Sequence, residues 1–203
     1  HFEGIYSAAF VWVNGNYVGY TQGANNVSEF DVTAYVRQGE NNVSVQVFRW
    51  SDGSYLEGQD MWHMSGIHRD VYLMATPKTF VRDHYITCDL NAADKYQSGT
   101  MNVALEMDNR DGLAAKKNVE VRLLSPEGME VAKLNSVFEF TQGQTVKTQN
   151  VSFDALTGLK LWTAETPNLY TVEVAQLDAD GKEEHVFSTK YGFRKIEVKN
   201  SNV

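Results

Sequence analysis

One segment of the chain, residues 50–66, concentrates the side chains whose types could do chemistry. Its acidic and aromatic members are Trp50, Asp52, Tyr55, Glu57, Asp60 and Trp62. Indole and phenol rings stack on the apolar faces of sugar rings, and carboxylate oxygens accept hydrogen bonds from sugar hydroxyls. A carboxylate here could also help to ligate a hard cation. The composition fits a loop that contacts a ligand as well as it fits a structural loop, in which Trp50 and Trp62 fill the core and the acids cap turns.

The three carboxylates could also include the acid and the nucleophile of a glycosidase. Glycoside hydrolysis needs two carboxylates across a cleft, roughly 5 to 9.5 Å apart. A single loop is a poor scaffold for that separation, so we predict no catalytic residue in this chain. His63 and His68 flank Gly66 without the spacing of a metal site. Cys88 ends the strand-like stretch Tyr85–Cys88, which predicts a buried, inert thiol.

The elements that must position residues 50–66 are β-strands. Hydrophobic and polar residues alternate in Val43–Val47, Val119–Leu123 and Thr171–Val174, which is typical of half-buried antiparallel strands. Asn14-Gly15, between two strand-like runs, predicts a two-residue hairpin turn. No stretch predicts a helix of useful length. The sequence therefore indicates an all-β protein.

Residues 51–65 form a long connector between two expected strands, Val43–Phe48 and Val71–Met74. Connectors of this length in compact β domains are usually functional. A break at Ala75–Lys78 predicts a boundary near residue 77, with domains at 1–77 and 78–203. The second domain has the size and strand rhythm of an immunoglobulin-like sandwich. Its strands are expected to start near Phe80, Met101, Asn118, Met129, Thr145, Tyr170 and His185.

Composition excludes several classes of protein. With 18 Lys and Arg against 26 Asp and Glu, the net charge of −8 argues against a nucleic-acid-binding surface, which needs clustered basic residues. No apolar run approaches the roughly 20 residues that cross a bilayer. We therefore expect a soluble protein without a membrane partner. The chain starts at His1 rather than at a Met, which we interpret as the start of an internal fragment.

The first 77 residues resemble the later half of the sugar-binding jelly-roll domain of glycoside hydrolase family 2. The similarity lies in Phe2–Gly4, Ser7–Ala9, Val11–Gly15, Val18–Tyr20, Ser28–Thr33, Gly39–Asn41 and Gly66–Val71. The string Arg49–Trp62 is more specific and looks like the long β-galactosidases of the lactose-operon type. Downstream, Leu161–Tyr170 and Tyr191–Ile196 resemble the family's second domain. The resemblance implies a partial jelly-roll (galactose-binding-like) β-sandwich followed by an immunoglobulin-like β-sandwich.

The resemblance also implies a role for Asp60. In the family the matching Asp reaches into the active site of a catalytic barrel, contacts galactosyl hydroxyls and helps to hold a sodium ion. The residues then expected to support the loop are Trp50, Asp52, Tyr55, Glu57 and Trp62. The family's catalytic glutamates and magnesium ligands lie in the barrel. The fragment is therefore expected to hold no cofactor itself, whereas the parent enzyme uses magnesium and sodium.

We therefore expect a non-catalytic N-terminal fragment, inactive by itself, of a retaining enzyme that hydrolyses terminal β-galactosides in carbohydrate metabolism. Its expected partners are the barrel and other domains of the parent chain and, in the parent, a galactoside. The compartment stays open between bacterial cytoplasm and periplasm. A jelly roll without its opening strands exposes sheet edges, which predicts self-association. Two alternatives remain, namely a free-standing carbohydrate-binding module with an exposed aromatic platform and a purely structural interaction domain.

Overall fold

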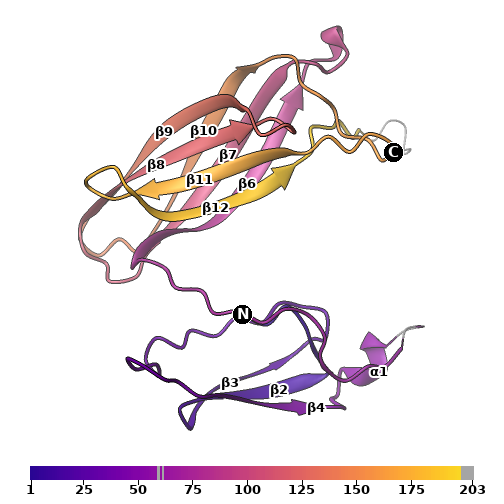
Figure 1. Ribbon diagram of the computed structural model, residues 1–203, viewed down its shortest axis with the longest axis vertical. Coiled ribbons are helices and arrows are strands. Elements are labelled where there is room, and N and C mark those ends of the chain that lie inside the picture. Colours follow the sequence, from indigo (N-terminus) through magenta and orange to yellow (C-terminus); the bar gives the residue numbers. More distant parts are fainter. Residues whose placement is uncertain (59, 61, 198–203) are drawn as a thin grey trace. The chain divides into compact units, whose positions relative to one another are not determined.

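The computed structural model describes residues 1–58, 60 and 62–197. The chain divides into two compact units, His1–Ala75 and Thr76–Val203. Strands dominate both units (Figure 1), and the helices of the described part are the single turn α1 (Ser54–Glu57) and the 3₁₀ turn η1 (Ala92–Asp94). The all-β class that the alternating pattern predicts is confirmed.

The second unit is a sandwich of two antiparallel sheets, which Figure 1 shows as two layers. One sheet has the order β10-β7-β6, with strands Val146–Leu156, Gly99–Asn109 and Thr79–Leu90. The other has the order β12-β11-β8-β9, with strands Glu183–Tyr191, Tyr170–Leu177, Ala115–Leu124 and Glu130–Phe140. All seven strands begin within three residues of their expected positions, so these predictions are confirmed.

Alternation along the strands builds the core of this unit. In β7, Met101, Val103, Leu105 and Met107 are each 0% exposed, and they are separated by residues that point to the other face. Successive side chains of a strand point to opposite faces of its sheet. The four buried side chains of β7 therefore all point inward and pack against the inner face of the other sheet. Burial of each such side chain stabilises the fold by about 1.5–3 kcal/mol. The repeated apolar residues thus hold the two layers together.

The first unit contains a three-stranded sheet and a short two-stranded one. The larger sheet has the order β3-β2-β4, with strands Asn16–Gln22, Ala8–Val13 and Val43–Phe48, and the smaller pairs β1 (Ile5–Tyr6) with β5 (Gly66–Ile67). The β2–β3 turn has positive φ at Asn14 (51°) and Gly15 (80°), as the predicted two-residue hairpin requires. Its core consists of Phe2, Ile5, Ala9 and Val11, with Val18, Phe30, Val45 and Val47 packed against it.

The strand expected at Val71–Met74 is not formed, so that prediction is wrong. Val71 makes an isolated bridge to Phe2, and Tyr72 exchanges backbone hydrogen bonds with His1. The four side chains of this segment are between 45% and 80% exposed. A run of strand-forming residues becomes a strand only when it can pair with the free edge of another strand. Among the described residues, the backbone pairing of this segment is limited to its contacts with His1 and Phe2.

Candidate functional site

The acidic-aromatic loop, residues 50–66, is fixed at its start by three serines. Ser7 lies between β1 and β2, and its hydroxyl contacts the hydroxyls of Ser51 and Ser54, the latter at 2.9 Å. The Ser54 hydroxyl also accepts a hydrogen bond from the Ser51 N–H at 2.9 Å. Ser7 is 0% and Ser54 5% exposed, so these hydroxyls bond to one another in place of water. The serine cluster thereby ties α1 to the sheet.

Two acids of the loop lie at the turn that begins α1. The Asp52 Oδ1 accepts a hydrogen bond from the Gly53 N–H at 3.0 Å, and the Glu57 carboxylate packs over Gly53, where an added Cβ would meet Oε1 at 3.0 Å. The Glu57 Oε2 is buried and accepts no hydrogen bond. Asp52 therefore makes a local hydrogen bond beside α1, which has no side-chain cap, and Glu57 packs close to the backbone.

The loop is fixed again at His63, to which the sequence analysis gave no function. Its Nδ1 lies 2.9 Å from the Tyr6 hydroxyl, and its ring centroid lies 6.2 Å from that of Trp50. The ring also packs on Gly58, where an added Cβ would approach the imidazole Cε1 to 1.9 Å. Only glycine therefore leaves room for this arrangement. Tyr6, Ser7 and His63 could not have been found from the sequence, because more than forty residues separate the partners along the chain.

Several side chains of the loop project into solvent. Tyr55 is 94%, Trp62 91% and Trp50 62% exposed, and Asp60 is exposed as well. Gln59 and Met61 lie outside the described residues. The indoles of Trp50 and Trp62 therefore do not fill the core, in contrast to the structural alternative. Support of the loop by Trp50, Tyr55 and Trp62 stays a prediction.

Asp60 is not part of a cluster of acidic, histidine or cysteine side chains in the described chain. Hard cations take several oxygen ligands, typically six or so. No group of three or more His, Cys, Asp or Glu that could hold a metal ion occurs among residues 1–58, 60 and 62–197. Asp60 is therefore the one carboxylate that the described chain would bring to the expected sodium site, and one carboxylate alone does not hold the ion.

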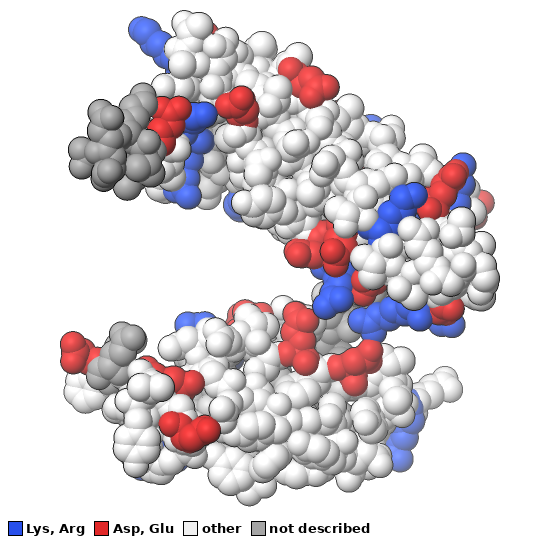
Figure 2. Space-filling model, turned by 180° about the vertical axis from the view of Figure 1, so that it is seen from behind, with Lys and Arg blue, Asp and Glu red and all other residues white. Residues whose placement is uncertain are grey.

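A second candidate surface is the aromatic face, which we define as Phe10, Trp12, Tyr17, Tyr20 and Phe48 on the outer side of the β3-β2-β4 sheet. Neighbouring ring centroids lie 4.9–6.0 Å apart, with interplanar angles between 46° and 84°. The three strands contain no charged residue, and Figure 2 shows broad uncharged surface on the first unit. Because the rings tilt against one another, they do not form a flat platform on which successive sugar rings could stack.

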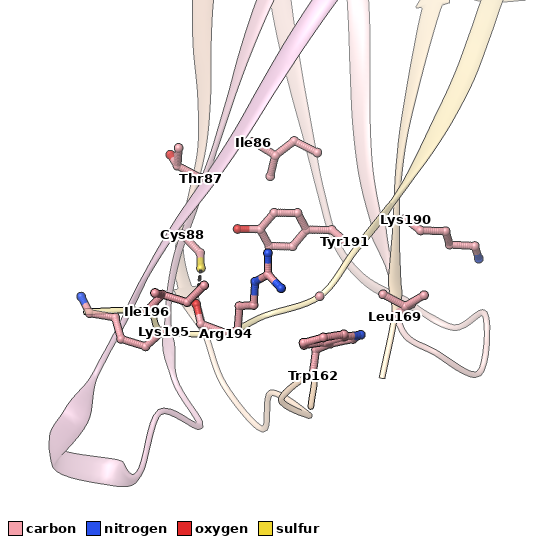
Figure 3. A pocket seen from close by; sticks show the side chains of 11 residues that line it. Ile86, Thr87, Cys88, Trp162, Leu169, Lys190, Tyr191, Arg194, Lys195 and Ile196 are labelled. Carbon is pink, nitrogen blue, oxygen red and sulfur yellow. Dashed lines mark hydrogen bonds between the residues drawn. The ribbon is translucent and has the colours of Figure 1, made fainter. Parts of the chain in front are cut away.

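The structure also bears on two other predictions, which concern Cys88 and membrane-spanning segments. Cys88 is half-buried and packs against the core of the second unit, and its thiol lies 3.8 Å from the carbonyl oxygen of Arg194 (Figure 3), so the predicted burial of this thiol is only partial. In this strand, β6, the exposed residues Tyr85, Thr87 and Asp89 alternate with Ile86 and Cys88, which pack against the core. Within the described ranges, no helix has both the length and the apolar character that crossing a membrane requires.

Comparison with known families assigns both units. Residues 1–77 match the model for "Glycosyl hydrolases family 2, sugar binding domain", and residues 79–194 match the model for "Glycosyl hydrolases family 2". The fold and these matches define a class of multidomain glycosidases. The chain belongs to glycosyl hydrolase family 2.

Curated relatives include β-galactosidases of three bacteria. The enzyme of Photobacterium profundum is 39% identical over 100% of this chain, that of Clostridium acetobutylicum 38% over 98%, and that of Priestia megaterium 37% over 98%. The chain covers 19%, 21% and 19% of these proteins, respectively. It thus spans about a fifth of the length of the relatives that it matches.

Solved structures of the family share the fold. A putative β-galactosidase from Bacteroides fragilis superposes with a TM-score of 0.82 at 24% identity, over 97% of this chain and 30% of that one. A β-glucuronidase from Bacteroides uniformis superposes with a TM-score of 0.83 at 20% identity, over 96% of this chain and 24% of that one. These similarities confirm the predicted class, a partial jelly-roll sandwich followed by an immunoglobulin-like sandwich.

Proposed function

We propose that this chain is a non-catalytic part of a β-galactosidase and that its acidic-aromatic loop completes the galactoside site of a catalytic barrel elsewhere in the longer protein. In this proposal Asp60 accepts hydrogen bonds from galactosyl hydroxyls and provides one oxygen ligand to a sodium ion. The two carboxylates that cleave the glycosidic bond, and the magnesium ligands, belong to the barrel. The curated relatives named above, each about five times as long as this chain, support the assignment.

The observation that carries the proposal is a loop with fixed ends and an exposed centre. The serine cluster and the Tyr6–His63 hydrogen bond hold the two ends against the sheet. Between them, the side chains of Tyr55, Asp60 and Trp62 have little or no packing within the described chain. Exposed aromatic and acidic side chains on an anchored backbone are arranged to contact another surface, since anchoring reduces the entropy lost on binding.

The proposed role of Asp60 is to position the galactosyl ring of the substrate. An ionised carboxylate accepts hydrogen bonds from two hydroxyls, and each hydrogen bond to a charged group contributes about 1.5–3 kcal/mol. Such bonds orient the galactosyl ring relative to the nucleophile of the barrel, which in a retaining enzyme lies about 5–5.5 Å from the acid. The sodium ion would add charge balance beside the carboxylate. Its remaining ligands come from other parts of the longer protein.

The test is Asp60→Asn in the longer enzyme. Loss of the charge is expected to lower kcat/KM for a chromogenic β-galactoside by at least about tenfold and to weaken the dependence of rate on sodium. Asp180→Asn, in the exposed turn between β11 and β12, is the matched control and should leave both unchanged. Unchanged kinetics for Asp60→Asn would favour the alternative of a purely structural interaction domain.

The isolated chain is expected to have no turnover with the same substrate, with magnesium and sodium present. Activity that survives repurification and is lost on substitution of Asp60 or Glu57 would overturn the proposal. A free-standing carbohydrate-binding module would instead show saturable binding of galactosides at millimolar concentration. The tilted rings of the aromatic face argue against that alternative.

Self-association is part of the proposal. Strands β3 and β4 are the edges of their sheet, and the uncharged aromatic face lies between them. Open edges pair with other chains unless they are covered or charged. Sedimentation of the isolated chain should therefore show species larger than a monomer whose proportion increases with concentration. A compact monomer at all concentrations would count against it.

A further inference from the structure

The chain before Asp60 and the chain after it meet at one imidazole ring, that of His63. Gly58 precedes Asp60 and His63 follows it in the sequence. A Cβ added to Gly58 would overlap the imidazole Cε1 and Nε2 of His63. The ring therefore occupies the space that a side chain at residue 58 would need. Through this contact, the backbone positions on the two sides of Asp60 constrain each other.

The glycine at position 58 is explained by this contact and not by its backbone conformation. Gly58 has φ −73° and ψ −35°, which is right-handed helical geometry that any L-residue adopts. Alanine would suit this geometry better, because glycine is among the poorest helix formers. A side chain here would displace the imidazole of His63. Glycine is therefore needed at this position only because His63 packs on it.

His63 is in turn held by Tyr6 of β1. The Tyr6 hydroxyl lies 2.9 Å from the imidazole Nδ1, and the two rings meet edge to face with their centroids 6.2 Å apart. Tyr6 is only 9% exposed and pairs with Gly66 in the β1–β5 sheet, whereas His63 is otherwise exposed. The next residue along the chain, Ser7, bonds to the serine cluster at the start of the loop. Two consecutive residues thus hold the loop on both sides of Asp60.

We propose that His63 and Tyr6 are positioning residues for Asp60, which hold its backbone where the carboxylate can meet a galactosyl ring and a sodium ion. The inference rests on the proposed function, which gives Asp60 these two ligands. His63 and Tyr6 touch neither ligand and act through the fraction of molecules in which Asp60 is in place. The apparent affinity for a ligand is proportional to that fraction. Loss of the Tyr6–His63 contact therefore weakens binding of the galactoside and of sodium together.

The first test is Tyr6→Phe in the longer enzyme, which removes the hydroxyl and keeps the ring. The KM for a chromogenic β-galactoside and the sodium concentration for half-maximal rate should both rise about twofold to tenfold, the effect of one hydrogen bond. The kcat should not change, because saturating ligand restores the binding-competent position. Loss of folded enzyme would instead lower kcat and leave KM unchanged, so the two parameters separate positioning from folding. His63→Ala should raise KM further, and His63→Asn, which keeps an acceptor near the Nδ1 position, should restore part of it.

Gly58→Ala gives a second test, in which the effects on binding and on stability have opposite signs. The added methyl group displaces the imidazole and should raise KM at least as much as Tyr6→Phe does. Urea unfolding of the variant should show no loss of stability, because alanine favours the helical backbone. The matched control is His68→Ala. His68 also packs its imidazole on a glycine, since a Cβ added to Gly4 would lie 2.8 Å from its Cε1, and its removal should leave KM unchanged.

A double substitution tests whether the effect passes through Asp60. In the Asp60→Asn enzyme, His63→Ala should change KM by less than about twofold, since the carboxylate that it positions is already lost. Effects that multiply in full would overturn the inference, as would an unchanged KM for Tyr6→Phe and Gly58→Ala, or an equal effect of His68→Ala. Unchanged kinetics for Asp60→Asn alone would instead reject the proposed function. Failure of the inference by itself would appear as impaired kinetics for Asp60→Asn with normal kinetics for Tyr6→Phe.

Discussion

The hydroxyl of Ser7 lies 2.9 Å from the hydroxyl of Ser54, although 47 residues separate them along the chain. Ser7 belongs to the junction of β1 and β2, and Ser54 opens α1. Both side chains are almost fully buried. This contact fixes where the acidic-aromatic loop begins, so the position of the exposed residues that follow depends on a hydroxyl at the junction of β1 and β2.

Ser7→Ala should destabilise the first unit by about 1–3 kcal/mol, because the hydroxyls of Ser51 and Ser54 lose a buried partner. Urea unfolding monitored by tryptophan fluorescence measures the change. Ser44→Ala is the control, since Ser44 is exposed on β4 and its hydroxyl bonds only locally, to Asn42. An effect of Ser7→Ala no larger than that of Ser44→Ala would show that the serine cluster does not hold the loop.

Gly99→Ala should destabilise the second unit by about 1–3 kcal/mol or more. A Cβ at this position would lie 2.3 Å from the carbonyl oxygen of Asp89, a backbone atom of the paired strand that cannot turn aside. Strands β6 and β7 would have to separate where Leu90 pairs with Gly99. Thermal unfolding checks the prediction, with the exposed neighbour Thr100→Ala as control. Equal melting temperatures for the two variants would contradict it.

The strands of the second unit could be predicted because apolar and polar residues alternate within each strand's own sequence. In β7 the buried Met101, Val103, Leu105 and Met107 alternate with more exposed residues. In the first unit, the β2–β3 hairpin could be predicted from Asn14-Gly15, because both turn residues have positive φ. The fold class therefore follows from period and turn chemistry alone.

The loop anchors and one strand could not be predicted, because they depend on partners far along the chain. Val71–Met74 has strand-forming residues but lacks a neighbouring edge. Ser7, Tyr6 and His63 have no local pattern that marks them as anchors of residues 50–66. The exposure of Trp50 and Trp62 was likewise open, since the same residue types suit a core and a binding surface.

Asn109→Ala should be among the most destabilising single substitutions of the second unit. Asn109 is 0% exposed, and its amide donates to the carbonyl oxygens of Leu113 at 2.8 Å and Gln144 at 2.9 Å. Its Oδ1 accepts from the Thr79 hydroxyl at 2.9 Å. Removing the amide leaves these groups without their partner, at a cost of about 2–4 kcal/mol. Denaturant unfolding measures the loss of stability, with Asn118→Ala, at an exposed position of β8, as the control. A loss below about 1 kcal/mol, roughly that of a surface substitution, would mean that water replaces the amide.

Acid should weaken the second unit in part through Glu184. Burial raises the pKa of this carboxyl, but hydrogen bonds from Lys117 at 2.7 Å and from Gln176 at 2.9 Å outweigh that effect, so the pKa lies below its ordinary value of 4.5. The buried Gln176 also donates to the carbonyl oxygen of Thr79 at 2.7 Å, which ties this pair to β6. Because the folded state binds the proton less readily than the unfolded chain, the stabilisation is complete above the unfolded pKa. It is lost as the pH falls through the folded pKa.

Glu184→Gln should therefore lower the free energy of unfolding by about 1–2 kcal/mol near pH 7 and flatten its decline below pH 4.5. Urea unfolding at a series of pH values gives both quantities. Glu130→Gln, on the exposed side of β9, should keep the acid dependence of the unsubstituted chain. Parallel stability curves for Glu184→Gln and the unsubstituted chain would show that the Lys117–Glu184–Gln176 contacts do not contribute to the acid sensitivity of the fold.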